Sequence, residues 1–463
     1  MNTRRNVTRT YLAATLITLA YGYYCRTLNA KTKNVNRIEN IENSICAPEL
    51  EISSVYTPPE FDMTLGALDP SLPRSLTVIR DETVVRLAPR RRARRRGVVM
   101  KDARLGPYAS TRGPGCRDVW YKIYTDSWIC GDHVRTSDLP PWGFRYPVVP
   151  KDKLTPWPYG FVREPTIEYR LRGGDLEESR DVLKGFGFGV KSRVTIDGTR
   201  FFKTAENTFI PRANAGISGR ISEFSGIEIK NGAPWPVGFV NSRKAWVYST
   251  PSRSERFRLG KVERYTPFQV RGFSGKGKRL FYRFDDKAWL HSKDVRIVRE
   301  APLPESIAKG ERWIDVDTKQ QIVTAYEGAT PVYVTLVSTG RIGASRTVKG
   351  EFRIWAKIAA IAMDNTDEEL EESAEDAADA GPAEERKLYS LHDVPWVQFF
   401  FESYGLHGVY WHDRFGNRRS HGCVNLAPID ARWFYDWTAP YLPDGWWAMH
   451  SSPNDKGTLV RVR

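Results

Sequence analysis

Cysteine is scarce in this sequence: five cysteines are spread over 463 residues. Cys423 has no second cysteine near it, which excludes a Cys-x-x-Cys zinc knuckle at that position. Long apolar runs are scarce as well. The apolar stretch at residues 11–24 is shorter than the about 20 residues that a membrane-spanning helix needs. We also find no signature of a nucleic-acid-binding module, so nucleic acid is not an expected partner.

The N-terminus resembles a secretion signal in its charge and hydrophobicity. Arg4, Arg5 and Arg9 precede the apolar stretch, and Leu28-Asn29-Ala30 follows it as a cleavage site. We therefore predict that residues 1–30 are a signal peptide, or an N-terminal anchor if they are not cleaved. Cys25 offers lipidation as an alternative, but in Gly22-Tyr23-Tyr24 the two residues directly before it are tyrosines and not the small residues expected there.

This signal predicts a location in the periplasm or cell envelope. Disulfides persist in that compartment, so Cys116 and Cys130 could pair there while Cys423 stays free. The formal net charge of +15 fits either a soluble basic surface or attraction to an anionic envelope polymer.

Aromatic residues are abundant, with 15 Trp, 21 Tyr and 21 Phe, and they favour β-rich modules. Residues 31–100 show little periodicity and end in the basic run at 90–96. We expect this region to be a disordered polybasic linker, either a solvated tail or a tether to anionic polymers.

The next 200 residues contain a repeat. The sequence Pro-Trp-Pro-Tyr-Gly-Phe-Val at 156–162 returns as Pro-Trp-Pro-Val-Gly-Phe-Val at 234–240. A polar turn followed by an aromatic residue occurs three times, at Trp128, Phe209 and Trp289, and we expect these rings to fill small β-barrel cores. The predicted modules span residues 101–150, 156–230 and 234–300.

A C-terminal domain is expected at 311–463. Residues 313–317 and 321–326 alternate around a turn and predict a hairpin, and Pro428 is well placed to begin a helix. An acidic, low-complexity insertion interrupts this domain at 364–386, where it could mask the basic run.

A histidine and a cysteine in this domain suggest thiol chemistry. His407 and Cys423 are too far apart in sequence for one helical face, so they must meet by chain reversal. An imidazole can take the thiol proton and leave sulfur ready to attack a carbonyl. Gly422 leaves room for a substrate, and the amides of residues 422 and 423 could face a developing oxyanion.

These residues resemble the YkuD-type L,D-transpeptidase catalytic domain. The matching positions are His407, Gly408, Ser420, His421, Gly422, Cys423 and Asn425. A departure occurs at residues 347–350, which read Thr-Val-Lys-Gly instead of Thr-Pro-Thr-Gly. The repeated modules resemble bacterial SH3-like modules. The resemblance implies a mainly β fold, with a β-sandwich-like catalytic domain preceded by SH3-like barrels.

The resemblance also implies a function: a peptidoglycan L,D-transpeptidase that forms a thioester between Cys423 and a donor tetrapeptide. His407 would be the base, oriented by the carbonyl of Gly408. Oxyanion and substrate contacts would come from Gly422, His421, Ser420, Asn425, Tyr389 and Arg419. Arg418 could share the last role, while His412 is expected to point away.

No metal or organic cofactor is implied. The partners would be peptidoglycan stem peptides, with envelope proteins as further acyl acceptors. The alternatives are an L,D-carboxypeptidase, an amidase-type hydrolase that uses the same cysteine, and a non-catalytic scaffold that binds the cell wall.

Overall fold

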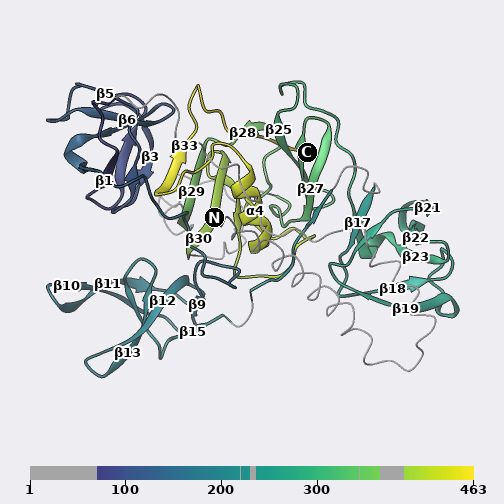
Figure 1. Cartoon of the computed structure of the whole chain (residues 1–463). Coiled ribbons are helices and arrows are strands. Elements are labelled where there is room, and N and C mark those ends of the chain that lie inside the picture. The colour runs from purple at the N-terminus through teal and green to yellow at the C-terminus, as the bar shows by residue number, and fades with distance from the viewer. Residues whose placement is uncertain (1–69, 219–220, 230–235, 344, 365–389) are drawn as a thin grey trace, which may run out of the picture. The chain divides into compact units, whose positions relative to one another are not determined.

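The computed structural model describes residues 70–218, 221–229, 236–343, 345–364 and 390–463 (Figure 1). The fold is mainly β, as predicted, with one α-helix among these residues. Among the described residues, the chain divides into two compact units, one within 227–301 and one within 70–226 together with 302–463. The predictions for residues 1–30, for Tyr389 and for the acidic insertion beyond Asp364 fall outside the described residues. No helix in the described part is long and apolar enough to cross a membrane.

The first β region begins well before the expected boundary at residue 101. Its elements are β1 (Ser75–Val78), β2 (Thr83–Arg86), β3 (Arg95–Val99), β4 (Arg104–Leu105), β5 (Ala109–Thr111), β6 (Trp120–Tyr124), β7 (Ser127–Cys130), the short turn η2 (Gly131–His133) and β8 (Val134–Ser137). Because β1 pairs with β4 and β8, and β2 pairs with β3, the expectation of a disordered linker is wrong for residues 70–100. The physical reason is that Leu76, Val85 and Val99 are fully buried beside the basic run.

The second region, in the same unit, contains β9 (Tyr159–Val162), β10 (Thr166–Arg172), β11 (Asp175–Val182), β12 (Gly187–Ile196), β13 (Thr199–Thr204), β14 (Phe209–Pro211) and β15 (Ala215–Ile217). The other unit contains β16 (Ile227–Glu228), β17 (Val237–Val240), β18 (Lys244–Tyr248), η3 (Glu255–Phe257), β19 (Arg258–Glu263), β20 (Pro267–Gln269), β21 (Gly272–Ser274), η4 (Gly277–Arg279), β22 (Phe281–Asp285), β23 (Ala288–His291), η5 (Ser292–Asp294) and β24 (Val295–Ile297).

The sequence repeat occupies equivalent strands in these two regions. β9 pairs with β12 and β15, and β17 pairs with β20 and β24. A phenylalanine ring covers the glycine of each copy: a Cβ on Gly160 would lie 2.7 Å from Phe188, and one on Gly238 would lie 2.6 Å from Phe268. The repeated glycine is therefore required by close packing. The SH3-like identity of the modules remains a prediction.

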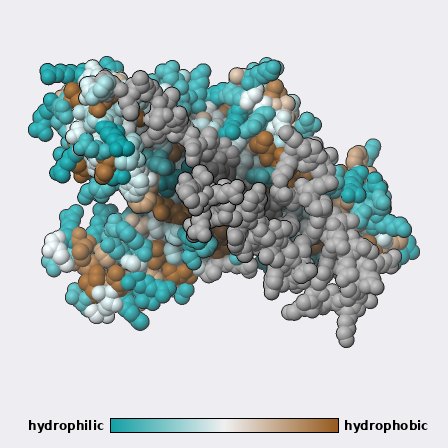
Figure 2. All heavy atoms as spheres, viewed as in Figure 1, coloured by the Kyte–Doolittle hydropathy of each residue, from teal (hydrophilic) through white to brown (hydrophobic). Residues whose placement is uncertain are grey.

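Two of the three expected core rings are only half-buried. Phe209 is buried, as predicted, but Trp128 and Trp289 are not fully covered. The residues that follow them, Ile129 and Leu290, are buried instead. Successive residues of a strand face opposite sides, so the core position is one residue later than expected. On the face drawn in Figure 2, hydrophobic residues form small groups among hydrophilic ones.

The C-terminal domain contains two sheets and one helix. Its elements are β25 (Arg312–Asp317), β26 (Ile322–Glu327), β27 (Thr330–Leu336), β28 (Gly350–Arg353), β29 (Ala356–Asp364), β30 (Ser390–Phe401), β31 (Tyr404–Gly408), β32 (Val424–Leu426), α4 (Pro428–Trp437), β33 (Trp446–His450) and β34 (Leu459–Val462). One sheet has the order β27-β26-β25-β34-β28, and the other runs β32-β31-β30-β29-β33. Ile314 and Val323 of the first sheet share one hydrophobic core with Leu406 of the second and Phe434 of α4.

The predicted hairpin and helix are both present. Asp317 forms the turn between β25 and β26, because its Oδ1 accepts hydrogen bonds from the backbone N–H groups of Lys319 and Gln320, both at 2.9 Å. Pro428 is the first residue of α4, where its missing N–H costs no helical hydrogen bond.

The second sheet continues into the N-terminal region. β3, in blue, pairs with β33, in yellow, through Gly97↔Met449 and Val98↔Ala448 (Figure 1). Arg96 at this junction is fully buried and forms an ion pair with Asp455. One arginine of the basic run is therefore part of the packed interior and not of a solvated tail.

Candidate active site

The two proposed catalytic side chains come from adjacent parallel strands. β31 pairs with β32 in the register Leu406↔Val424, His407↔Asn425 and Gly408↔Leu426. Cys423 directly precedes β32, two residues before the partner of His407. The register thus places Val424, the residue after Cys423, opposite Leu406, the residue before His407. The thiol of Cys423 lies beside the N–H of Gly405, two residues before His407 on β31.

Cys423 holds a neutral thiol. Its side chain is half-buried, and its Sγ lies 3.5 Å from the carbonyl oxygen of Ser403, which can only accept a hydrogen bond. Burial raises the pKa of Cys423 to about 11, although the N–H of Gly405 works in the opposite direction. In the resting protein the sulfur is therefore protonated at neutral pH.

His407 is neutral as well, and its tautomer follows from its partner. The residue is 2% exposed, and its Nδ1 lies 3.1 Å from the carbonyl oxygen of Gly408. Since a carbonyl accepts only, Nδ1 carries the proton and Nε2 keeps its lone pair. Burial lowers the pKa of His407 to about 4. Trp411 stacks near the imidazole, with ring centroids 5.9 Å apart.

The loop before Cys423 is held by the hydroxyl of Ser420. This hydroxyl donates to the carbonyl of Cys423 at 2.5 Å and accepts from the N–H of Gly422 at 3.2 Å. The backbone amide of Gly422 is therefore occupied, and of the two amides expected to face an oxyanion, that of Cys423 is the better candidate. Gly422 has φ +144, and a Cβ there would lie 2.5 Å from the ring of Tyr404. Both conditions require glycine.

Thr347 was not predicted as a site residue, although it lies in the segment that departs from the family pattern. It is fully buried, and its Oγ1 accepts from the N–H of Gly340 at 2.9 Å and donates to the carbonyl of Gly422 at 2.6 Å. Thr347 thus fixes the peptide that directly precedes the nucleophile. Its position in the departing segment was the only sequence signal.

Asn425 belongs to the framework of the site. Its backbone pairs with Ser338 through two hydrogen bonds of 2.9 and 3.0 Å. Its side-chain Nδ2 lies 3.1 Å from Nε2 of His412, so His412 contacts the residue that pairs with His407. The structure thus connects His412 to the site through Asn425.

The remaining predicted residues form a basic group beside the loop. Burial lowers the pKa of Arg419, and the nearby charges of Arg414 and Arg341 lower it further. Burial and Arg341 likewise lower the pKa of His421. Arg418 has a different role, because it donates to the carbonyls of Gly340 and Thr318 at 3.1 and 2.7 Å and so supports the backbone.

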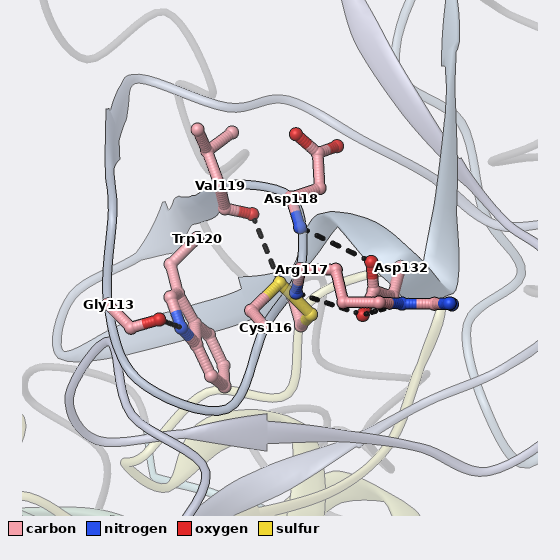
Figure 3. Close-up of a disulfide and its surroundings, with 8 residues drawn as sticks. Gly113, Cys116, Arg117, Asp118, Val119, Trp120 and Asp132 are labelled. Atoms are coloured by element: carbon pink, nitrogen blue, oxygen red, sulfur yellow. Dashed lines mark hydrogen bonds and ion pairs between the residues drawn. A yellow bond between two sulfur atoms is a disulfide. The ribbon is translucent and has the colours of Figure 1, made fainter.

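Within the described residues, one group has side chains close enough to hold a metal ion: Cys116, Cys130 and Asp132 (Figure 3). The two cysteines form the predicted disulfide, so their sulfurs are not available as thiolate ligands. Asp132 accepts from the backbone N–H groups of Arg117 and Asp118 at 3.1 and 3.3 Å. This group therefore braces a loop.

Comparison with known proteins agrees with the C-terminal part of this architecture. Residues 311–462 match the model of the YkuD family, which is described as the L,D-transpeptidase catalytic domain. This segment accordingly carries a catalytic domain of that family, while the match leaves the N-terminal regions unassigned. No curated protein matches the chain.

Solved structures of L,D-transpeptidases resemble the chain weakly. An L,D-transpeptidase from Mycobacterium smegmatis is 16% identical over 42% of this chain and 81% of its own, with a TM-score of 0.25. L,D-transpeptidase 3 from Mycobacterium tuberculosis is 16% identical over 42% and 79%, with a TM-score of 0.24. One from Stackebrandtia nassauensis is 24% identical over 34% and 57%, with a TM-score of 0.21.

Proposed function

We propose that this protein is a peptidoglycan L,D-transpeptidase of the cell envelope. The observation that supports the proposal is the register of β31 and β32, which pairs the residue before His407 with the residue after Cys423 inside a segment that matches the family model. Sγ attacks the carbonyl of the third residue of a donor tetrapeptide. The terminal D-alanine leaves, and an amine from a second stem peptide or from an envelope protein resolves the thioester.

Proton transfer in this scheme begins from a neutral pair. The thiol pKa of about 11 and the imidazole pKa of about 4 oppose a resting thiolate–imidazolium ion pair. Nε2 of His407 therefore accepts the thiol proton as sulfur attacks, and later donates it to the leaving amine. The carbonyl of Gly408 holds Nδ1–H and stabilises the transient imidazolium, as the third member of a catalytic triad does.

The oxyanion and substrate contacts are assigned from the local hydrogen bonds. The amide of Cys423 is our oxyanion donor, and one such donor contributes roughly 3 kcal/mol to transition-state stabilisation. Ser420 and Asn425 support the loop and the strand. Arg419 provides positive charge for a stem carboxylate, while the lowered pKa of His421 favours a neutral imidazole that can take part in a hydrogen bond. Tyr389 remains a further candidate. The β regions before residue 302 would then be SH3-like modules that attach the enzyme to the wall.

The test is an assay of the full chain on tetrapeptide-bearing muropeptides, with Cys423→Ala as the matched control. We expect D-alanine release and dimeric products from the wild type and neither from the variant. Tripeptide without dimer would indicate a carboxypeptidase instead. A reaction that persists in Cys423→Ala would refute the assignment of Cys423 as the nucleophile. If neither protein reacts, the result favours a non-catalytic scaffold that binds the cell wall. A carbapenem should form a covalent adduct with the wild type only.

A further inference from the structure

A cavity lies on the side of α4 that faces the segment after β8. Its volume is about 230 Å³, below the about 300–1,000 Å³ of pockets for drug-sized ligands, so it has room for one small ring. Its lining residues are Phe144, Arg145, Tyr146, Pro147, Val148, Val149, Trp396, Arg432 and Asp436. Trp396 also packs against Gly408, where a Cβ would lie 3.0 Å from the indole. The cavity therefore shares a wall with the catalytic strand.

The polar groups of the cavity carry both signs of charge. The guanidinium of Arg145 donates to Asp436 at 3.0 Å, and the side chain of Arg432 lies 4.0 Å from the same carboxylate. Asp436 is 6% exposed, whereas the side chain of Arg145 is 44% exposed. A ligand that carries only negative charge would be repelled by Asp436, and a ligand that carries only positive charge would be repelled by the two arginines. A neutral hydroxyl can donate to the carboxylate and accept from a guanidinium.

A row of aromatic rings leads away from the cavity. Trp142, Phe144 and Tyr146 occupy alternate positions of one segment, and their consecutive ring centroids are 4.7 and 6.3 Å apart. Trp447 extends the row, 5.6 Å from Tyr146. Trp142 is 46% exposed and Phe144 is 50% exposed. These neighbouring rings are available for contact with a ligand.

We propose that the cavity and this aromatic row, named here the 142–147 site, bind a glycan strand. One pyranose ring fills the cavity, where its hydroxyls hydrogen-bond to Arg145 and Asp436. The apolar face of the next sugar stacks on Phe144, whose ring is 50% exposed. A polyol with flat apolar faces matches both the mixed charges and the exposed rings. The choice of an N-acetylated sugar as the probe rests on the proposed function, because stem peptides are attached to such glycans.

The experiment measures binding of N-acetylglucosamine tetraose to the full chain by isothermal titration, in the Cys423→Ala background. Catalysis is absent there, so failure of the glycan site and failure of the transpeptidase proposal are separate results. We expect binding of the tetraose but not of a free stem tetrapeptide. Phe144→Ala and Arg145→Ala should each weaken binding roughly tenfold, equivalent to about 1.4 kcal/mol. Phe273→Ala, at a ring that is 74% exposed in the other unit, should have no effect.

Phe144→Leu separates stacking from general hydrophobicity, because leucine keeps apolar area without a flat face. We expect it to weaken binding nearly as much as alanine, while the melting temperature stays unchanged for this exposed position. Absence of tetraose binding to the parent protein would overturn the proposal. So would tetraose binding that is equally tight in Phe144→Ala and Arg145→Ala, or tetrapeptide binding that depends on Phe144.

Discussion

The hydroxyl of Thr347 donates to the carbonyl oxygen of Gly422 across 2.6 Å, and this contact holds the peptide that precedes Cys423. Thr347→Val keeps the shape of the side chain but leaves this carbonyl and the N–H of Gly340 without their partner. We expect a loss of about 2 kcal/mol in the free energy of unfolding and at least tenfold in kcat. Thr347→Ser should retain most of both quantities. Full activity in the valine variant would contradict the assigned role.

Alkylation of Cys423 should depend steeply on pH. Its raised pKa of about 11 means that the reactive thiolate grows nearly tenfold per pH unit between pH 7 and 10. We expect the iodoacetamide rate, measured by mass spectrometry on the peptide that contains Cys423, to follow this slope. That readout excludes labelling at other cysteines. A rate that stays flat over this range would indicate a preformed thiolate–imidazolium pair.

Acidification should destabilise the protein through His407. The unfolded chain binds a proton near the ordinary histidine pKa of about 6.5, but the folded chain only near 4. Unfolded molecules therefore take up the proton first as pH falls, and stability declines from about pH 6.5 to 4 by up to about 3 kcal/mol. In His407→Asn, the amide can still donate to Gly408 but does not titrate.

Urea unfolding of the wild type and of His407→Asn at several pH values measures how much His407 contributes to the pH dependence of the unfolding free energy. We expect the difference in unfolding free energy between the two proteins to change with pH between 6.5 and 4 and to be constant above 7. A constant difference over the whole range would mean that His407 does not gain its proton on unfolding.

Arg96 offers a test of the junction between the N-terminal region and the catalytic domain. Arg96→Ala leaves the mostly buried Asp455 without its ion-pair partner, which should cost about 3 kcal/mol of stability. Arg94→Ala, in the same basic run at an exposed position, is the matched control and should change stability by less than about 0.5 kcal/mol. Equal effects in chemical unfolding would show that only net charge matters.

Local patterns in the sequence predicted local structure well. The Asp317 turn and the Pro428 helix start depend on neighbouring residues, so they could be predicted directly. The pairing of His407 with the region of Cys423 followed from the motif. Thr347 could not be found in this way, because its role arises from hydrogen bonds to residues 7 and 75 positions away.

Charge runs and aromatic spacing were less informative. The run at 90–96 predicts solvated chain, yet Arg96 is buried because Asp455, from the far end of the sequence, neutralises it. The aromatic spacing likewise predicts Trp128 in the core, but the buried residue is its neighbour Ile129, because a shift of one residue along a strand exchanges the two faces. Both outcomes depend on contacts between distant segments.

The pairing of β3 with β33 bears on how this chain can be truncated. A recombinant fragment that begins near residue 302 would retain β33 but expose the backbone groups that Gly97 and Val98 now satisfy. Such a bare strand edge invites intermolecular pairing and precipitation. Expression work on the catalytic domain should therefore start upstream of β1, so that the neighbouring region protects this edge.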